Sequence, residues 1–148
     1  MSFKITFPTV WANFDPNGHM RHTAYNDLAA EVRVRHFDSL GLSLAEFTKN
    51  GIGPVLFSEN TNFWKEIRIG ENVTVDVTLI GASKNYERYR FHSNVYKENG
   101  ELAAEIEVYG SWLDLTKRKL AVLPEDIVQV FDKVDKHPSF KEIELKKK

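Results

Sequence analysis

The spacing of apolar residues changes abruptly along this chain, and that change constrains its fold more than any other feature. From about Thr23 to Leu40, apolar residues recur at the three-to-four-residue spacing of an amphipathic α-helix. Over 73–79 they alternate with polar residues, which is typical of a strand with one buried face. A helix and a sheet that each have one apolar face must cover each other. We therefore expect an α+β fold in which an antiparallel sheet wraps around one long helix.

Five segments have the composition or the two-residue period of strands, and they are residues 2–12, 55–67, 73–79, 89–95 and 102–112. Asn99-Gly100 is a strong hairpin turn between the last two segments. A sheet of about five strands leaves free edges, so we also expect the chain to dimerise.

The predicted helices carry recognisable end signals. Thr23 is expected to cap the long helix and Gly41 to end it. Ser43 and Glu46 form a capping-box pattern, which predicts a short second helix over about 43–50.

The last part of the chain is predicted to hold one more helix. Pro124 is typical of a helix start, so we expect a helix over about 124–134 and a polar tail over about 137–148. A chain of 148 residues without a linker or an internal repeat predicts a single domain, 1–148.

Composition excludes several classes of function. The net charge of −1 gives no basic bias toward nucleic acid or an anionic membrane. The absence of cysteine excludes disulfides, thiolate nucleophiles and cysteine-ligated metal sites. No apolar run approaches the roughly 20 residues that cross a bilayer, and the N-terminal segment does not resemble a signal peptide. We expect a cytoplasmic protein.

The loop NFDPNGHMRHTAY, residues 13–25, holds the densest set of reactive side chains. Asp15 precedes a proline, and Asn17-Gly18 supplies a turn that swings the start of the helix near His22 back toward Asp15. A helix N-terminus offers unpaired N–H groups and about half a positive charge, which can stabilise an oxyanion. A carboxylate opposite it can attack a carbonyl carbon or activate a water. The loop is therefore a candidate acyl-transfer centre.

Two alternatives remain open on spacing alone. In the first, Asp15 and Asn17 only shape a turn, and His19 and His22 are surface residues. In the second, Asp15 and the two histidines converge on a metal ion, which would need a further ligand that the neighbouring sequence lacks.

The same loop resembles a family signature. Asp15-x-x-Gly18-His19, with Tyr25 ten residues after the aspartate, is similar to the D-x-x-G-H-V-N-N-x-x-Y pattern of the 4-hydroxybenzoyl-CoA thioesterase-like branch of the hotdog-fold superfamily. The similarity extends to the order of elements over about 3–116. It implies a hotdog fold, with a five-stranded antiparallel sheet around a long central helix. It also implies hydrolysis of an acyl-CoA or acyl-carrier-protein thioester, without a metal or another cofactor.

The resemblance further implies roles for the loop residues. Asp15 matches the family's catalytic carboxylate, which acts as nucleophile or general base. The backbone N–H of His22 matches the donor that polarises the thioester carbonyl, and its side chain matches a histidine that assists the chemistry in a short-chain acyl-CoA subgroup. Tyr25 would line the acyl pocket or pack the first helical turn, and His19 would have an orienting role.

Residues outside the loop are implied as substrate contacts at the subunit interface of a homodimer or homotetramer. Lys84, Arg88 and Arg90 lie where relatives place basic residues, which would meet the phosphates of CoA, although an ordinary solvated strand face explains them as well. Ser58 and Glu59 lie on a strand that runs near the partner's site in this fold, where they could contact the thioester or a water.

The chain also departs from the signature. Arg21-His22 replaces the usual Asn-Asn pair, so the motif does not identify the class of acyl group that the substrate carries. Lys65-Glu66 stands where many relatives have a proline. Two alternative functions therefore stay in view. One is a hotdog hydratase, which uses an Asp–His pair with four intervening residues where this loop has three. The other is a non-enzymatic acyl-CoA or fatty-acyl binding module.

Overall fold

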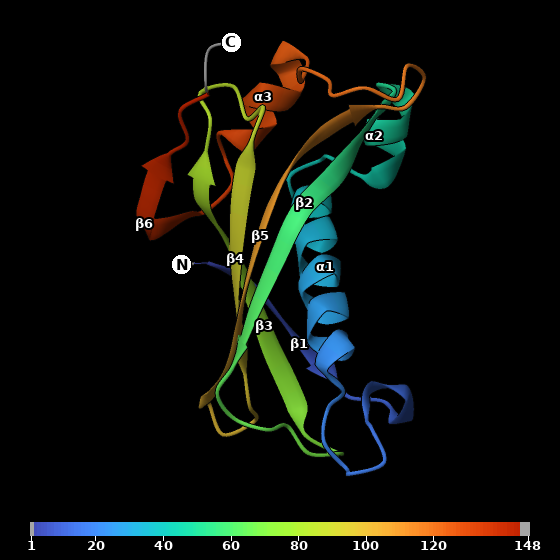
Figure 1. Ribbon diagram of the computed structural model, residues 1–148, viewed down its shortest axis with the longest axis vertical. Coiled ribbons are helices and arrows are strands. Elements are labelled where there is room, and N and C mark those ends of the chain that lie inside the picture. The colour runs from blue at the N-terminus through green and yellow to red at the C-terminus, as the bar shows by residue number, and fades with distance from the viewer. Residues whose placement is uncertain (1, 146–148) are drawn as a thin grey trace.

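A sheet that curves around a single long helix, α1, forms the body of the protein (Figure 1). The computed structural model describes residues 2–145, and within them the strand order is β1-β3-β4-β5-β2, with β6 also paired to β3. In chain order the elements are β1 (Phe3–Pro8), a 3₁₀ turn (Trp11–Asn13), α1 (His22–Ser39), α2 (Leu44–Lys49), β2 (Ile52–Phe63), β3 (Asn72–Ala82), β4 (Tyr89–Tyr96), β5 (Leu102–Asp114), α3 (Glu125–Phe131) and β6 (Lys136–Glu142).

The core lies between α1 and the sheet, as the two apolar periods predict. The alternating residues of β3, Val73 to Leu79, are fully buried on one face, and burying each such side chain contributes about 1.5–3 kcal/mol. On α1, Ala24 and Ala29 are also fully buried, so the helix backbone lies close to the sheet. None of the helices within residues 2–145 has the length and apolarity that a membrane span requires.

The helix ends follow the sequence signals in one case and depart from them in another. Ser43 caps α2 as predicted, because its hydroxyl accepts a hydrogen bond from the Glu46 N–H at 3.3 Å. The prediction that Thr23 caps α1 is wrong. The helix begins at His22, two residues before the start that a cap at Thr23 implies, and the hydroxyl of Thr23 binds the guanidinium of Arg21 instead. The N-cap residue, Arg21, makes no side-chain capping bond, so the first turn of α1 keeps free N–H groups.

Two predictions about the sheet and the end of the chain are wrong. Within residues 2–145 the sheet has six strands rather than five, and the first part of the expected polar tail, as far as Glu142, belongs to β6, which pairs parallel to β3. The end of the expected tail, 146–148, lies outside the described residues. The cause is the length of β3, because β1 pairs with its first half only, as far as Val77. The returning chain pairs with the remaining half, where the Leu79 N–H donates to the Asp135 carbonyl at 2.8 Å. The predicted last helix exists as α3 and is shorter than expected, ending at Phe131.

One edge of the sheet is β2, which pairs only with β5 among the described strands and bulges at Phe57, and the other edge is formed by β1 and β6. Opposite the bulge, the Tyr89 hydroxyl crosses to the Val55 carbonyl and donates to it at 3.2 Å. Gly110 lies beneath this bond. A Cβ there would lie 2.2 Å from the Val55 oxygen and 2.6 Å from the Tyr89 hydroxyl, which explains the glycine.

We predict that Gly110→Ala destabilises the protein, because the added methyl group must displace the β2 backbone or the Tyr89 ring. The expected loss is about 1–3 kcal/mol, which corresponds to several degrees in Tm by thermal unfolding. Gly53→Ala is the matched control, since its Cβ would meet only the end of the Leu115 side chain, at 3.1 Å. Equal stability of the two variants would contradict the packing described above.

Candidate active site

The loop between β1 and α1 folds into a turn that closes on Asp15. The Oδ1 atom of Asp15 accepts hydrogen bonds from the N–H groups of Asn17 at 2.9 Å and His19 at 3.3 Å. Gly18 has a φ of +80°, the left-handed conformation that favours glycine. Both bonds use Oδ1, so Oδ2 has no hydrogen-bond partner among residues 2–145 and is free for chemistry.

The start of α1 is anchored next to this turn. The Met20 N–H donates to the Ile67 carbonyl and the Arg21 N–H donates to the Asn13 carbonyl, both at 2.8 Å. The next two N–H groups, those of His22 and Thr23, have no acceptor within the described part of the chain. They carry the positive end of an 18-residue helix and can bind an oxygen atom that gains negative charge.

An open cleft of about 590 Å³ brings the predicted loop residues together. Both polar and apolar side chains line it, and they are Asp15, His19, Met20, His22, Tyr25, Phe63, Trp64, Lys65 and Glu66. All four loop residues expected at the site are thus in one cleft. Burial raises the pKa of the Tyr25 hydroxyl, and the Tyr25 ring packs edge-on against Phe63 with 5.1 Å between ring centroids. Tyr25 and Phe63 therefore form an apolar wall beside the reactive groups.

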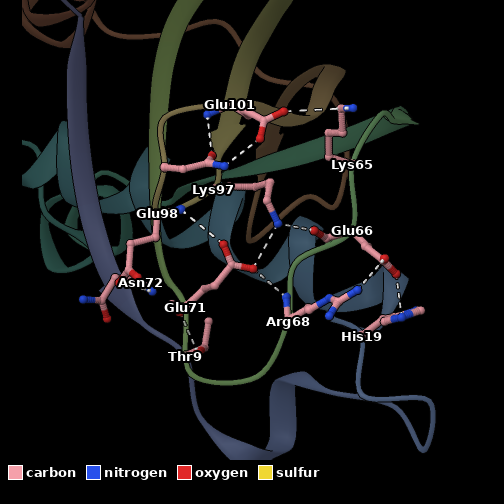
Figure 2. A network of polar contacts seen from close by, with 11 residues as sticks. Thr9, His19, Lys65, Glu66, Arg68, Glu71, Asn72, Lys97, Glu98 and Glu101 are labelled. Atoms are coloured by element: carbon pink, nitrogen blue, oxygen red, sulfur yellow. Dashed lines mark hydrogen bonds and ion pairs between the residues drawn. The ribbon is translucent and has the colours of Figure 1, made fainter.

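Glu66 was not among the predicted site residues, although it lines the cleft. Figure 2 shows its carboxylate between His19 and Arg68, with His19 Nε2 at 2.5 Å and an Arg68 guanidinium nitrogen at 3.6 Å. His19 is thereby tied to the loop that joins β2 to β3, and it also forms an isolated β-bridge with Arg68. Glu66 is 47 positions from His19 along the sequence, so no local spacing rule indicates this contact.

Glu71 fixes the same β2–β3 loop from the other side (Figure 2). Its carboxylate accepts hydrogen bonds from the Arg68 N–H at 2.8 Å and the Lys97 ammonium at 3.0 Å. Burial acts to raise the pKa of Glu71, but these bonds outweigh it and hold the pKa below its ordinary value. The Lys97 ammonium also donates to the Glu66 carbonyl at 2.6 Å, so the two glutamates are held by one cation.

The other predicted contacts lie away from the cleft within one chain. Ser58 and Glu59 are exposed on the edge strand β2. Lys84 and Arg88 lie in the segment between β3 and β4, at the opposite end of the sheet from the loop (Figure 1). Arg88 donates to the Ser111 hydroxyl at 3.0 Å.

Metal ligation was the second alternative for the loop. Within residues 2–145 no group of three or more His, Cys, Asp or Glu side chains has the arrangement of a metal site. A carboxylate and a free helix N-terminus in one cleft form an arrangement that can support acyl transfer.

The sequence matches the model of the Thioesterase-like superfamily over residues 9–131. The chain belongs to this superfamily. No curated protein matches the sequence at a significant level. The resemblance to a thioesterase family that the loop indicated is thus confirmed.

Solved structures with this fold include CoA-binding proteins and thioesterases. A hypothetical protein from Staphylococcus aureus, solved in complex with CoA, has a TM-score of 0.83 at 24% identity, covering 95% of this chain and 90% of its own. A DHNA-CoA thioesterase from the same organism has a TM-score of 0.81 at 23% identity, covering 88% of each chain. A 1,4-dihydroxy-2-naphthoyl-CoA thioesterase from Synechocystis has a TM-score of 0.79 at 20% identity, covering 93% of this chain and all of its own. These structural similarities show that the chain shares its fold with these proteins.

We predict that Glu71→Gln destabilises the protein by about 1 kcal/mol near pH 7, because the neutral amide weakens the charge-assisted hydrogen bonds and removes the attraction to Lys97. A carboxyl with a lowered pKa stabilises the fold above its ordinary pKa of 4.5, and this contribution is lost as the pH falls through the lower value. The free energies of urea unfolding of the two proteins should therefore differ at pH 7 and converge as the pH falls below 4.5 and through the lowered pKa of Glu71. A difference that persists at low pH would contradict this assignment.

Proposed function

We propose that the protein hydrolyses an acyl-CoA or acyl-carrier-protein thioester in the cleft between the β1–α1 loop and the start of α1. One observation carries the proposal: in a chain of the Thioesterase-like superfamily, Asp15 and the free N-terminus of α1 share one cleft. Two of the structurally similar proteins are CoA thioesterases and a third was solved with CoA, which favours CoA as the carrier.

The reaction uses groups already in place. The thioester carbonyl oxygen accepts a hydrogen bond from the His22 N–H, where the helix stabilises the negative charge that develops on it. The free Oδ2 of Asp15 attacks the carbonyl carbon, or takes a proton from the water that does so. The carbon–sulfur bond then breaks and the thiolate takes up a proton. CoA leaves as the thiol. Where Asp15 attacks directly, water then hydrolyses the acyl–Asp15 anhydride and frees the carboxylate; where Asp15 activates a water, that water forms the acid directly. In both routes water supplies the hydroxyl of the acid.

The remaining loop residues support this step. The exposed imidazole of His22 lines the cleft and can pass a proton to the departing sulfur. His19 orients the loop through its pair with Glu66, and Tyr25 borders the acyl group. The cytoplasmic location expected from the sequence stays a prediction.

The same proposal includes a homodimer formed through β2, or a homotetramer built from such dimers. The edge of β2 has unpaired backbone groups, and large apolar side chains on this strand and just after it are about half exposed, namely Leu56 42%, Phe57 49%, Phe63 50% and, after the strand, Trp64 57%. A two-fold axis would pair the two β2 strands antiparallel and make one continuous sheet. The far end of each sheet, with Lys84 and Arg88, would then approach the cleft of the other protomer, where they can contact the phosphates of CoA.

We predict that Asp15→Asn lowers kcat for thioester hydrolysis by about 100-fold or more, typical for the loss of an acid–base group. The amide oxygen of asparagine still accepts the two N–H groups that close the turn, so the fold and substrate affinity should remain. The measurement is release of free thiol from short, long and aromatic acyl-CoAs.

The matched control is Asp38→Asn, which makes the same change on an exposed residue near the far end of α1 and should hydrolyse like the wild type. Equal turnover by Asp15→Asn and wild type would reduce Asp15 to a turn residue. Binding of acyl-CoA without turnover by either protein would favour a binding module.

We predict that Phe57→Lys shifts the protein toward monomer in sedimentation experiments, because a lysine on an edge strand opposes pairing with another copy. Val122→Lys is the control, since Val122 is also an exposed apolar residue (72%) and lies outside β2. A dimer of unchanged stability in Phe57→Lys would argue against pairing through β2.

A further inference from the structure

A second cavity, of about 220 Å³, lies beside the C-terminal half of α1. Its walls come from α1, α2 and the first residues of β2, with β4 and β5 beneath, and they are mostly apolar, including Phe37, Phe47, Leu56 and Trp112. Among the described residues that line it, Arg33 alone is charged. A dry cavity of about 150 Å³ holds a benzene molecule, so this one has room for a ring or a short alkyl chain.

The guanidinium of Arg33 has no ionic partner in the described chain. Within residues 2–145 no carboxylate lies within 4.0 Å of it, whereas Arg35, two positions away on the outer face of α1, pairs with Glu31 at 3.4 Å. Burial lowers the pKa of Arg33, and Glu59 at a longer distance acts in the opposite direction. An arginine remains charged near pH 7, so the cavity holds a cation without a neutralising group.

The phenol of Tyr89 does not supply the missing negative charge. Burial raises the pKa of this hydroxyl to about 12, so the phenol is neutral at physiological pH. Its proton is also used, because it is donated to the Val55 carbonyl.

A cation in apolar surroundings is costly unless an anion pairs with it. The planar fork of a guanidinium matches a carboxylate, to which it can donate two parallel hydrogen bonds. The combination of apolar walls and one unpaired arginine therefore fits a ligand that has a hydrocarbon body and a terminal carboxylate.

The position of the cavity connects it with the proposed active site. Arg33 is 11 residues from His22, or about 16 Å along the helix axis. Within one chain the Thr61 hydroxyl donates to the Asn26 side chain at 2.8 Å, and this bond joins β2 to α1 between the two cavities. Antiparallel pairing of two β2 strands would place the Phe63 end of one beside the Ile52 end of the other. The cleft of one protomer would then adjoin the arginine cavity of its partner.

We propose that this cavity of one protomer binds the far end of an acyl group held in the cleft of its partner, and that the preferred substrates are thioesters of dicarboxylic acids, whose free carboxylate pairs with Arg33. The inference rests on the proposed thioesterase function and names its substrate class.

The test compares glutaryl-, adipoyl- and suberoyl-CoA with valeryl-, hexanoyl- and octanoyl-CoA, which differ only in the terminal carboxylate. For the wild type we expect kcat/KM on the best carboxylated substrate to exceed that on its uncharged match by about tenfold or more. Arg33→Leu should remove this preference by raising KM, with little change on the uncharged series. Arg33→Lys should keep part of it, and Arg35→Leu should behave like the wild type.

Two outcomes would overturn the inference. One is a higher kcat/KM of the wild type on the uncharged series than on the carboxylated series. The other is an equal loss of kcat/KM on both series in Arg33→Leu. If Arg33→Leu also dissociates or unfolds, as sedimentation and circular dichroism would show, Arg33 pairs with protein rather than with substrate.

If no thioester is turned over, the proposed function fails and the cavity is tested by calorimetry with glutaryl-CoA and valeryl-CoA. Tighter binding of the carboxylated ligand by wild type, lost in Arg33→Leu, would still support the assignment of the cavity. Equal binding by both proteins would overturn it.

Discussion

The packing of α1 against the sheet is the contact on which the rest of the structure depends. Two fully buried alanines, Ala24 and Ala29, bring the helix backbone close to the valine-rich face of β3. This contact sets the position of both ends of α1. At one end the free N–H groups of the first turn face the loop that carries Asp15. At the other end the helix forms one wall of the cavity that contains Arg33. One buried helix thus positions both features that the proposed chemistry uses.

The loop that carries Asp15 owes its shape to short-range bonds and its position to long-range ones. Asp15 closes its own turn through one carboxylate oxygen and keeps the other free. The position of that turn is set by the β2–β3 loop, which holds His19 through Glu66 and is itself held by Glu71 and Lys97. Such a supporting layer matters because a small misplacement of a reacting group costs much of its rate enhancement. The lysine that holds both glutamates therefore contributes to the site without touching the cleft.

Sequence reasoning succeeded for most local signals. The two-residue period of β3, the capping of α2 by Ser43 and the turn at Asp15 each depend on residues a few positions apart, and all were predicted. The local exception is the cap of α1, because the Thr23 hydroxyl binds Arg21 instead. The other failures came from contacts between distant segments. The strand β6 forms because β1 leaves half of β3 unpaired, and the sequence of β6 itself has little apolar alternation. The contact of Glu66 with His19 and the unpaired state of Arg33 also depend on tertiary packing, which spacing rules do not describe.

The central claim is that the free start of α1 binds the thioester carbonyl opposite Asp15. The most direct measurement is a crystal structure of the protein with an acyl-CoA ketone analogue, in which a methylene group replaces the thioester sulfur. We predict that the ketone oxygen lies about 2.7–3.1 Å from the His22 backbone nitrogen, with the Asp15 carboxylate on the opposite side of the carbonyl carbon. A ketone bound away from the first turn of α1, or a carbonyl carbon beyond the reach of Asp15, would contradict the claim.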